Sequence, residues 1–140
     1  MSGKLKAGVI GLGILGSMHA EYMHTLPTVE VVALADIRRE VAERLASKIN
    51  ARPYSDYREM LREQRLDVVV VATPDPLHRE PTVAALEAGV PNIILEKPLA
   101  TTMADALAIY EAVEKHRARL FVDFSNRAAP LDIATRYVIQ

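Results

Sequence analysis

Short apolar runs alternate with longer amphipathic stretches along almost the whole chain. The runs span about five or six residues and the stretches about ten or more, which is typical of repeated strand–helix units. We therefore predict six strands, of which the run at 52–54 is the shortest. Their expected bounds are Leu5–Ile10, Val29–Ala35, Arg52–Tyr54, Asp67–Ala72, Asn92–Leu95 and Leu120–Phe124.

Two of these runs are continuously apolar. Residues 31–35 read Val-Val-Ala-Leu-Ala and residues 68–72 read Val-Val-Val-Val-Ala. A strand with one face in water would alternate apolar and polar side chains, so these strands are expected to be covered on both faces of a parallel sheet. Right-handed helical crossovers then predict a doubly wound α/β fold, with a mainly parallel sheet and helices on both faces.

Apolar residues also recur at helical spacing between the strands. Two stripes are expected to face the core, and a third set shares one face of a later helix. The stripes are Leu15, Met18, Tyr22 and Leu26, then Val41, Leu45 and Ile49; the third set is Met103, Leu107 and Tyr110.

Capping residues predict where three helices begin or end. Ser55-Asp56 is expected to open a helix that runs to about Glu63. A helix over about Arg79–Ala88 is expected to end at Gly89, and Thr101 or Thr102 is expected to cap the start of the helix that contains Met103.

Composition narrows the classes of function. The 140 residues include 17 Lys and Arg against 18 Asp and Glu, so the net charge of −1 gives no basic surface for nucleic acid. The absence of cysteine excludes disulfides and thiolate metal sites, and the 4 His are scattered, so no metal site is predicted. The apolar runs are far shorter than the roughly 18 to 20 residues that span a bilayer, so no membrane contact and a cytoplasmic location are expected.

A glycine loop follows the first predicted strand. Gly11, Gly13 and Gly16 form a G-x-G-x-x-G pattern that opens the first helix. In a dinucleotide-binding loop the first glycine permits the tight turn, the second lets the backbone approach a pyrophosphate, and the third lets helix and strand pack closely. The helix N-terminus then favours the phosphates. Alone the motif is weak, because a plain strand–helix turn also explains these glycines.

An acidic residue at the end of the second strand strengthens this interpretation. Asp36 lies where a carboxylate accepts hydrogen bonds from the adenosine ribose, although it could simply cap the next helix. The carboxylate would repel the 2′-phosphate of NADP, whereas Arg38 and Arg39 could attract it unless they only form a solvated helix start. NAD is therefore favoured and NADP stays possible.

The carboxyl ends of the later strands carry further motifs, and ligands of open parallel sheets bind at such ends. They are Ala72-Thr-Pro-Asp-Pro-Leu-His78, Glu96-Lys97-Pro98, and Phe121 to Arg127 with Pro130 beyond. With the glycine loop and His19-Ala20, the chain from Ala7 to about Pro130 resembles the glucose-fructose oxidoreductase, inositol dehydrogenase and rhizopine-catabolism family of NAD(P)-dependent oxidoreductases. Glu96-Lys97-Pro98 is the most specific element.

The resemblance implies a Rossmann domain over 1–130 that belongs to a dehydrogenase of sugars, inositols or related polyols. It implies that Thr73, Pro74 and His78 line the middle of the cofactor and that Glu96 and Lys97 lie beside the nicotinamide. The expected cofactor-binding set is Gly11, Gly13, Ile14, Leu15, Gly16, Asp36, Ile37, Arg38, Ala72, Thr73, Pro74, His78, Glu96, Lys97, Asn126 and Arg127. The chain departs from the family pattern at Asp75, where Asn is common, and at Ala128, where an aromatic residue is common.

Lys97 is the expected catalytic residue. Hydride transfer from a carbinol carbon develops negative charge on the substrate oxygen, which a positioned ammonium stabilises. The alternative is a surface ion pair between Lys97 and Glu96. His78 could equally be a helix cap or a packing residue, and His19 is expected to pack under the sheet and is left outside the site.

Residues 131–140 are expected to begin a helix that leads to a substrate domain, for which no residues follow. The first hypothesis is therefore the cofactor-binding domain of an NAD(P)-dependent oxidoreductase, inactive by itself. The second is a stand-alone NAD(H)-binding or redox-sensing module, which would have no use for Lys97. A methyltransferase of the same topology is a distant third. The expected partner of the full enzyme is a small polyol or sugar, and a homo-oligomer is possible.

Overall fold

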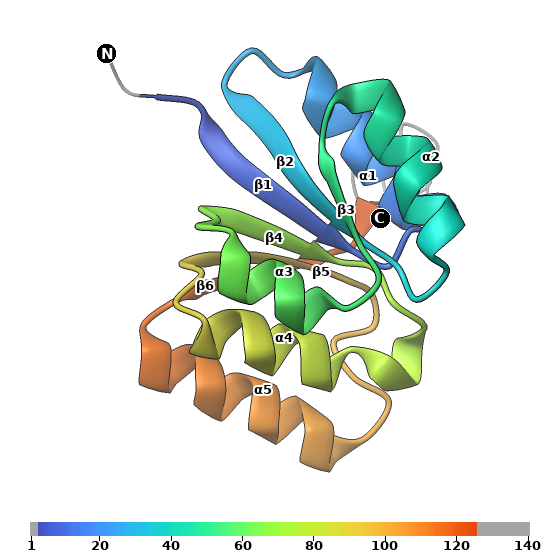
Figure 1. Ribbon diagram of the computed structural model, residues 1–140. Helices are drawn as coiled ribbons and strands as arrows, with labels where there is room; N and C mark the ends of the chain where they lie inside the picture. The colour runs from blue at the N-terminus through green and yellow to red at the C-terminus, as the bar shows by residue number, and fades with distance from the viewer. Residues whose placement is uncertain (1–2, 126–140) are drawn as a thin grey trace, which may run out of the picture.

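A computed structural model describes residues 3–125 of the chain. They form one six-stranded sheet in the order β3-β2-β1-β4-β5-β6, in which every neighbouring pair is parallel (Figure 1). The strands are β1 Leu5–Ile10, β2 Val29–Ala35, β3 Arg52–Tyr54, β4 Val68–Val71, β5 Asn92–Glu96 and β6 Arg119–Asp123. The predicted parallel, doubly wound sheet is confirmed.

The strand predictions differ from the structure by one residue at most at any end. The first three strands match throughout, β4 is shorter at both ends, β5 includes Glu96, and β6 begins at Arg119 and ends at Asp123. Just before β4, the Asp67 carboxylate accepts a hydrogen bond from the Lys6 backbone N–H at 2.8 Å. Side-chain contacts of this kind are invisible to apolar periodicity.

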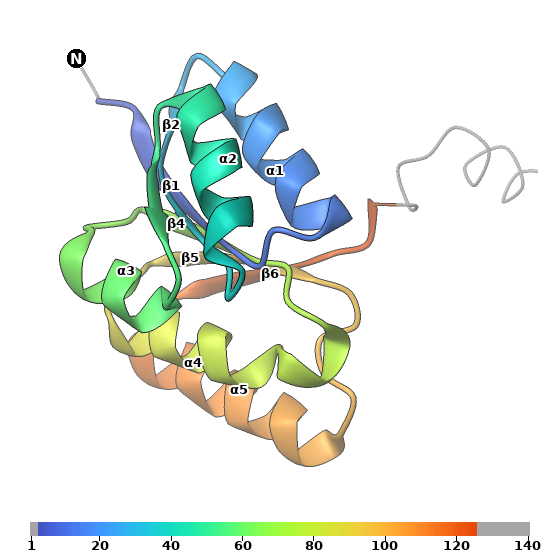
Figure 2. The same ribbon diagram turned by 45° about the vertical axis from the view of Figure 1, so that its right-hand side comes forward.

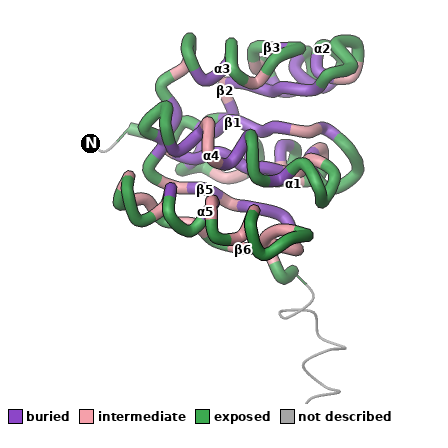
Figure 3. Tube along the Cα trace, turned by 90° about the horizontal axis from the view of Figure 1, so that it is seen from below, coloured by how far each residue is buried: buried purple, intermediate pink, exposed green. Residues whose placement is uncertain are grey.

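Helices cover both faces of the sheet, as Figure 2 shows. One face carries α1 (Ile14–Thr25) and α2 (Arg39–Ile49), and the other carries α3 (Tyr57–Glu63), α4 (Arg79–Glu87) and α5 (Met103–His116). The two resulting cores lie on opposite sides of the sheet. Figure 3 shows that strands β1, β2 and β5 are buried along most of their length. The strand order reverses between β1 and β4, which opens a crevice at their carboxyl ends.

Of the apolar stripe predicted to face the core on α1, only Leu26 packs against the core, and the prediction is wrong for the other three residues. Leu15, Met18 and Tyr22 are 44%, 59% and 66% exposed, whereas Gly16, Ala20 and Met23 are buried. The helix lies close to the sheet on its small residues, which leaves the larger side chains on its flank in water. Amphipathic spacing cannot distinguish the two faces when the buried one is made of glycine and alanine.

The face shared by Met103, Leu107 and Tyr110 on α5 is also exposed, and this helix packs through Ile109 and Ala112. The stripe on α2 behaves as predicted: Leu45 and Ile49 are buried and Val41 is half-buried. The side opposite to the stripe of α2 is charged, so only one orientation of that helix buries apolar surface.

The predicted helix boundaries are confirmed. Asp56 accepts a hydrogen bond from the Arg58 N–H at 2.8 Å, and the Thr102 hydroxyl accepts one from the Asp105 N–H at 3.1 Å. Gly89 follows α4 with a φ of +83°, a conformation that glycine adopts without a steric penalty. The helix expected at 131–140 lies outside the described residues.

Within residues 3–125 we find no helix whose length and apolar character would let it span a bilayer.

Candidate cofactor site

The glycine loop joins β1 to α1 at the strand-order reversal. Gly11 has a φ of +86°, and a Cβ there would lie 2.7 Å from the Ala72 carbonyl oxygen. A Cβ on Gly16 would collide with the Gly11 carbonyl oxygen, so helix and loop touch directly. The tight turn and the close packing predicted for the first and third glycines are confirmed.

Gly13 differs from its two neighbours in the motif. It precedes α1 at the N-cap position without any side-chain cap, and a Cβ there would meet nothing within 4 Å. Its φ of −69° is open to any residue. The missing side chain therefore leaves free space in front of the first N–H groups of α1, which is where an anion is stabilised by the helix dipole.

Asp36 directly follows β2, and both of its carboxylate oxygens accept hydrogen bonds. Oδ2 accepts from the Leu12 N–H at 2.7 Å, and Oδ1 accepts from the Arg38 N–H at 2.9 Å and from Arg38 Nε at 3.2 Å. A carboxylate offers about four acceptor positions, so one remains for a ligand hydroxyl. The alternative interpretation, a helix cap, is only partly met because α2 begins three residues later.

The pKa of Asp36 is lowered from its ordinary value. Burial alone would raise this pKa, but the hydrogen bonds from Arg38 and Leu12, together with the Arg38 charge, outweigh the cost of burial. Asp36 is therefore an anion at neutral pH. Arg39 instead pairs with Glu43 at 2.7 Å on the exposed start of α2.

A cavity of about 850 Å³ extends from the glycine loop past Asp36 to the loop after β4. Its volume lies in the range of small-molecule and cofactor sites. Ten of the predicted cofactor residues line this cavity: Gly11, Gly13, Ile14, Leu15, Asp36, Ile37, Arg38, Ala72, Thr73 and Pro74. Gly16 packs against the glycine loop at Gly11 and does not line the cavity. Asn126 and Arg127, like Ala128, lie outside the described residues.

His78 does not line this cavity. It is 1% exposed, and its Nδ1 and Nε2 lie 2.7 Å from the Pro98 carbonyl oxygen and 3.0 Å from that of Thr73. The ring thereby joins the loop after β4 to the loop after β5. This geometry favours the packing interpretation of His78, in which it positions both loops.

Lys97 and Glu96 lie at the carboxyl end of β5 with opposite surroundings. Lys97 is exposed, whereas Glu96 is 6% exposed and its Oε1 lies at hydrogen-bond distance, 2.9 Å, from His19 Nε2. Among the described residues Glu96 and Lys97 form no ion pair, so the alternative explanation of Lys97 as an ion-pair partner fails here. The Lys97 ammonium is open to a ligand at this edge of the sheet.

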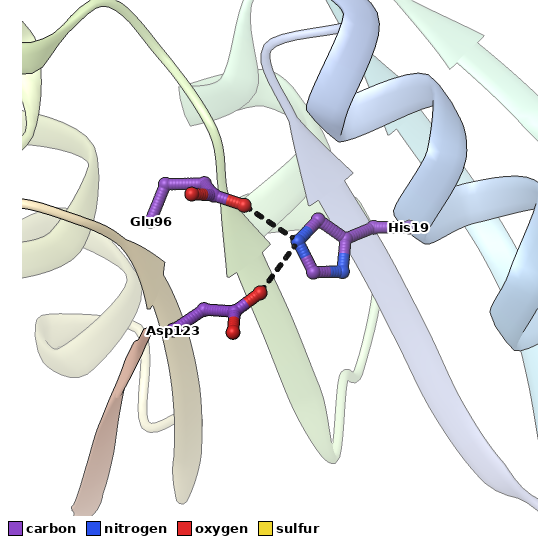
Figure 4. Close-up of side chains that lie close together, drawn as sticks. All are labelled: His19, Glu96 and Asp123. Atoms are coloured by element: carbon purple, nitrogen blue, oxygen red, sulfur yellow. Dashed lines mark hydrogen bonds and ion pairs between the residues drawn. The ribbon is translucent and has the colours of Figure 1, made fainter. Parts of the chain in front are cut away.

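The expectation that His19 packs under the sheet is wrong. Its Nε2 lies 2.9 Å from Glu96 Oε1 and 3.4 Å from Asp123 Oδ2, at the ends of β5 and β6 (Figure 4). These three donor atoms lie within 4.8 Å of one another and are of the types that bind divalent cations. The sequence carried no signal for this cluster, because 77 residues separate His19 from Glu96.

Residues 5–124 match the model of a protein family described as an oxidoreductase family with an NAD-binding Rossmann fold. This family is the one that the motifs resemble. The chain belongs to it. The predicted Rossmann domain and its NAD chemistry are thereby confirmed at the level of the family.

Curated relatives in this family include inositol and sugar dehydrogenases. The chain is 37% identical over 119 residues to inositol 2-dehydrogenase of Salmonella typhimurium, a match that covers 83% of this chain and 35% of the relative. It is 37% identical over 130 residues to D-glucoside 3-dehydrogenase of Escherichia coli, covering 91% of this chain and 37% of the relative. The chain thus spans little more than a third of the relatives it matches.

Solved structures agree with the fold. An NAD-binding oxidoreductase from Klebsiella pneumoniae superposes with a TM-score of 0.81 at 32% identity, over 97% of this chain and 38% of that protein. The WlbA dehydrogenase from Bordetella pertussis, solved in complex with NADH and UDP-GlcNAcA, gives 0.85 at 28% identity, over 98% of this chain and 42% of that protein.

Proposed function

We propose that this Rossmann domain supplies the cofactor half of a dehydrogenase that transfers a hydride between NAD and a polyol or sugar. The observation that carries the proposal is the cavity that joins the uncapped N-terminus of α1 to the ionised Asp36. The relatives, which are named as inositol and glucoside dehydrogenases, support the substrate class.

The residues of the cavity divide into two roles. Gly11, Gly13 and the first turn of α1 would hold the pyrophosphate through backbone N–H groups. The open acceptor position of Asp36 would receive a hydroxyl of the adenosine ribose. Thr73 and Pro74 would contact the middle of the cofactor.

Asp36 favours NAD over NADP. A 2′-phosphate would be placed against an anion whose pKa is lowered. Arg38, the cation best placed to offset that repulsion, already donates to Asp36 through Nε. This contact ties part of the Arg38 charge to Asp36, which lessens what Arg38 can offer a 2′-phosphate.

Lys97 is proposed as the catalytic residue. Bound NAD would supply the hydride acceptor for oxidation of a carbinol. The exposed ammonium at the end of β5 would stabilise negative charge on the substrate oxygen as its proton leaves. The sensing-module alternative gives no reason for an exposed lysine at this place.

Calorimetry on the chain tests the cofactor assignment. Titration with NADH should show one site, and Asp36→Ala should weaken NAD binding relative to NADP. The matched control is Glu43→Ala, which removes a carboxylate from the exposed face of α2. No binding at about 1 mM NADH would overturn the proposal, since that limit corresponds to roughly −4 kcal/mol. An unchanged NAD preference in Asp36→Ala would remove the ribose assignment.

The enzyme assignment needs the full-length protein that carries this domain. We expect it to reduce NAD with a polyol or sugar, and Lys97→Met to lower kcat by at least about 100-fold while NADH affinity is kept. NADH binding without turnover of any polyol or sugar would favour the sensing module. A homo-oligomer and a cytoplasmic location stay predictions.

A further inference from the structure

Three ionisable side chains from distant parts of the chain meet at the carboxyl ends of β5 and β6. His19 comes from α1, Glu96 ends β5 and Asp123 ends β6, and the imidazole Nε2 lies between the two carboxylates (Figure 4). We call these three residues the His19 cluster. Glu96 is almost fully buried, whereas His19 and Asp123 are partly open to solvent, at 21% and 25% of their side-chain surface.

The His19 cluster is negative whichever form the imidazole takes. Two carboxylates and one imidazolium sum to −1, and with a neutral imidazole the sum is −2. Among the described residues no lysine or arginine pairs with Glu96 or Asp123. The cluster therefore adds negative charge at this edge of the sheet, which the exposed Lys97 ammonium next to Glu96 offsets in part.

The position of the cluster determines which part of a dinucleotide it faces. A Rossmann sheet binds its cofactor across the strand-order reversal, one mononucleotide on each half. Asp36, the residue proposed to hold the adenosine ribose, follows β2 on the half formed by β1 and β2, so the nicotinamide falls to the half whose strands end at Glu96 and Asp123. The nicotinamide ring is a cation in NAD⁺ and neutral in NADH.

We propose that the His19 cluster makes this domain prefer the oxidised cofactor, with Asp123 as the residue that tunes the preference. The proposal rests on the proposed function, because it requires the dinucleotide to bind in the stated orientation. Asp123 is the adjustable member, since it is partly exposed and its 3.4 Å contact with His19 is the longer of the two. Glu96 is the structural member, because its burial makes its loss costly.

The experiment compares the Kd of NAD⁺ with that of NADH for wild type and Asp123→Asn, by calorimetry in buffer with EDTA so that no divalent cation occupies the cluster. Asn keeps the shape and removes one negative charge. We expect the ratio Kd(NAD⁺)/Kd(NADH) to rise about three- to tenfold, as for one partly solvated unit charge within a Debye length. Asp123→Glu retains the charge and should keep the ratio close to that of wild type.

Glu87→Gln is the control for net charge. Glu87 is exposed at the last residue of α4 and has no ion pair among the described residues. The same change of charge there should leave the ratio unchanged. Should Asp123→Asn fail to fold, the wild-type ratio measured at rising ionic strength replaces it, because screening should move the ratio in the same direction.

The outcomes separate this inference from the function on which it rests. A ratio that rises in Asp123→Asn alone supports the inference. An unchanged ratio, or equal weakening of both cofactors, overturns it and leaves NAD binding intact. Failure of the wild type to bind either cofactor overturns both.

Discussion

The two halves of the site are built in different ways. On the half of β1 and β2, the turn, the helix start and Asp36 follow one another in sequence, and the hydrogen bond from the Leu12 N–H to Asp36 spans 24 residues. On the half of β4, β5 and β6, His78 and the His19 cluster join loops and strands, and one contact spans 77 residues. Cofactor geometry is set locally, whereas the charge near the proposed reaction centre depends on the assembled sheet.

The two halves also differ in chemistry. The first is a cavity lined mainly by small and apolar residues, with Asp36 held by hydrogen bonds in its wall. The second is an open edge with an exposed lysine beside a cluster of one imidazole and two carboxylates. The first half is suited to holding a ligand and the second to acting on one.

Gly16→Ala should have the largest effect, because it breaks the contact between loop and helix. The new Cβ would collide with the Gly11 carbonyl oxygen, which is backbone and cannot rotate away. We expect the free energy of unfolding to fall by about 2 to 4 kcal/mol, measured by urea denaturation. Gly3→Ala, which meets nothing within 4 Å, is the control. Wild-type stability in Gly16→Ala would show that the loop can move away from the helix.

His78→Ala tests the second half. Removing the ring frees two buried carbonyl contacts and leaves a cavity, so the free energy of unfolding should fall by about 2 to 3 kcal/mol. His24→Ala, at an exposed histidine, should change it by less than about 0.5 kcal/mol. Equal effects of the two substitutions in denaturant melts would contradict a role of His78 in joining the loops.

Gly13→Ala should separate binding from stability within the first half. The Cβ meets no protein atom within 4 Å and φ is ordinary, so the free energy of unfolding should change by less than about 1 kcal/mol. The methyl group would occupy the space in front of α1, so NADH affinity should fall about tenfold or more. Calorimetry and denaturation on one sample distinguish this result from that of Gly16→Ala. Unaltered NADH affinity would place the pyrophosphate elsewhere.

The contribution of Asp36 to the free energy of unfolding should be the smallest of these effects, and it should depend on pH. Its folded-state pKa lies below the ordinary value of 3.8, so its ionised form stabilises the fold above that value. This stabilisation is lost as pH falls from about 4 through the lowered folded pKa. The difference in unfolding free energy between wild type and Asp36→Asn should therefore shrink as the pH falls below about 5. Denaturation across this range measures it, and a difference that grows on acidification would contradict the assignment.

Much of the first half could be predicted from sequence. The strand bounds of β1, β2 and β3 follow from apolar runs, the cap at Asp56 from a neighbour two residues away, and the turn at Gly11 from the spacing of the glycines, so the sequence records all three. The α1 stripe was misassigned because the burial of Ala20 and the exposure of Tyr22 depend on how closely the helix approaches the sheet. Glycine and alanine permit that approach but do not mark it in a hydrophobic pattern.

His78 and His19 show the same limit at the site. Each was one histidine on a helix or at its start, with no local feature to distinguish packing from function. The structure places His78 between two loops and His19 between two strand-end carboxylates.

By itself the sequence determined the parallel doubly wound sheet, the glycine loop, the acidic residue after the second strand and the family, since these follow from apolar runs and motifs with short spacing. Only the tertiary structure decided which helix faces are buried, what His78 holds together and that His19 joins Glu96 and Asp123. The physical reason is that parallel strands gather their carboxyl ends at one edge. Residues far apart in the chain therefore meet there through contacts that no local pattern records.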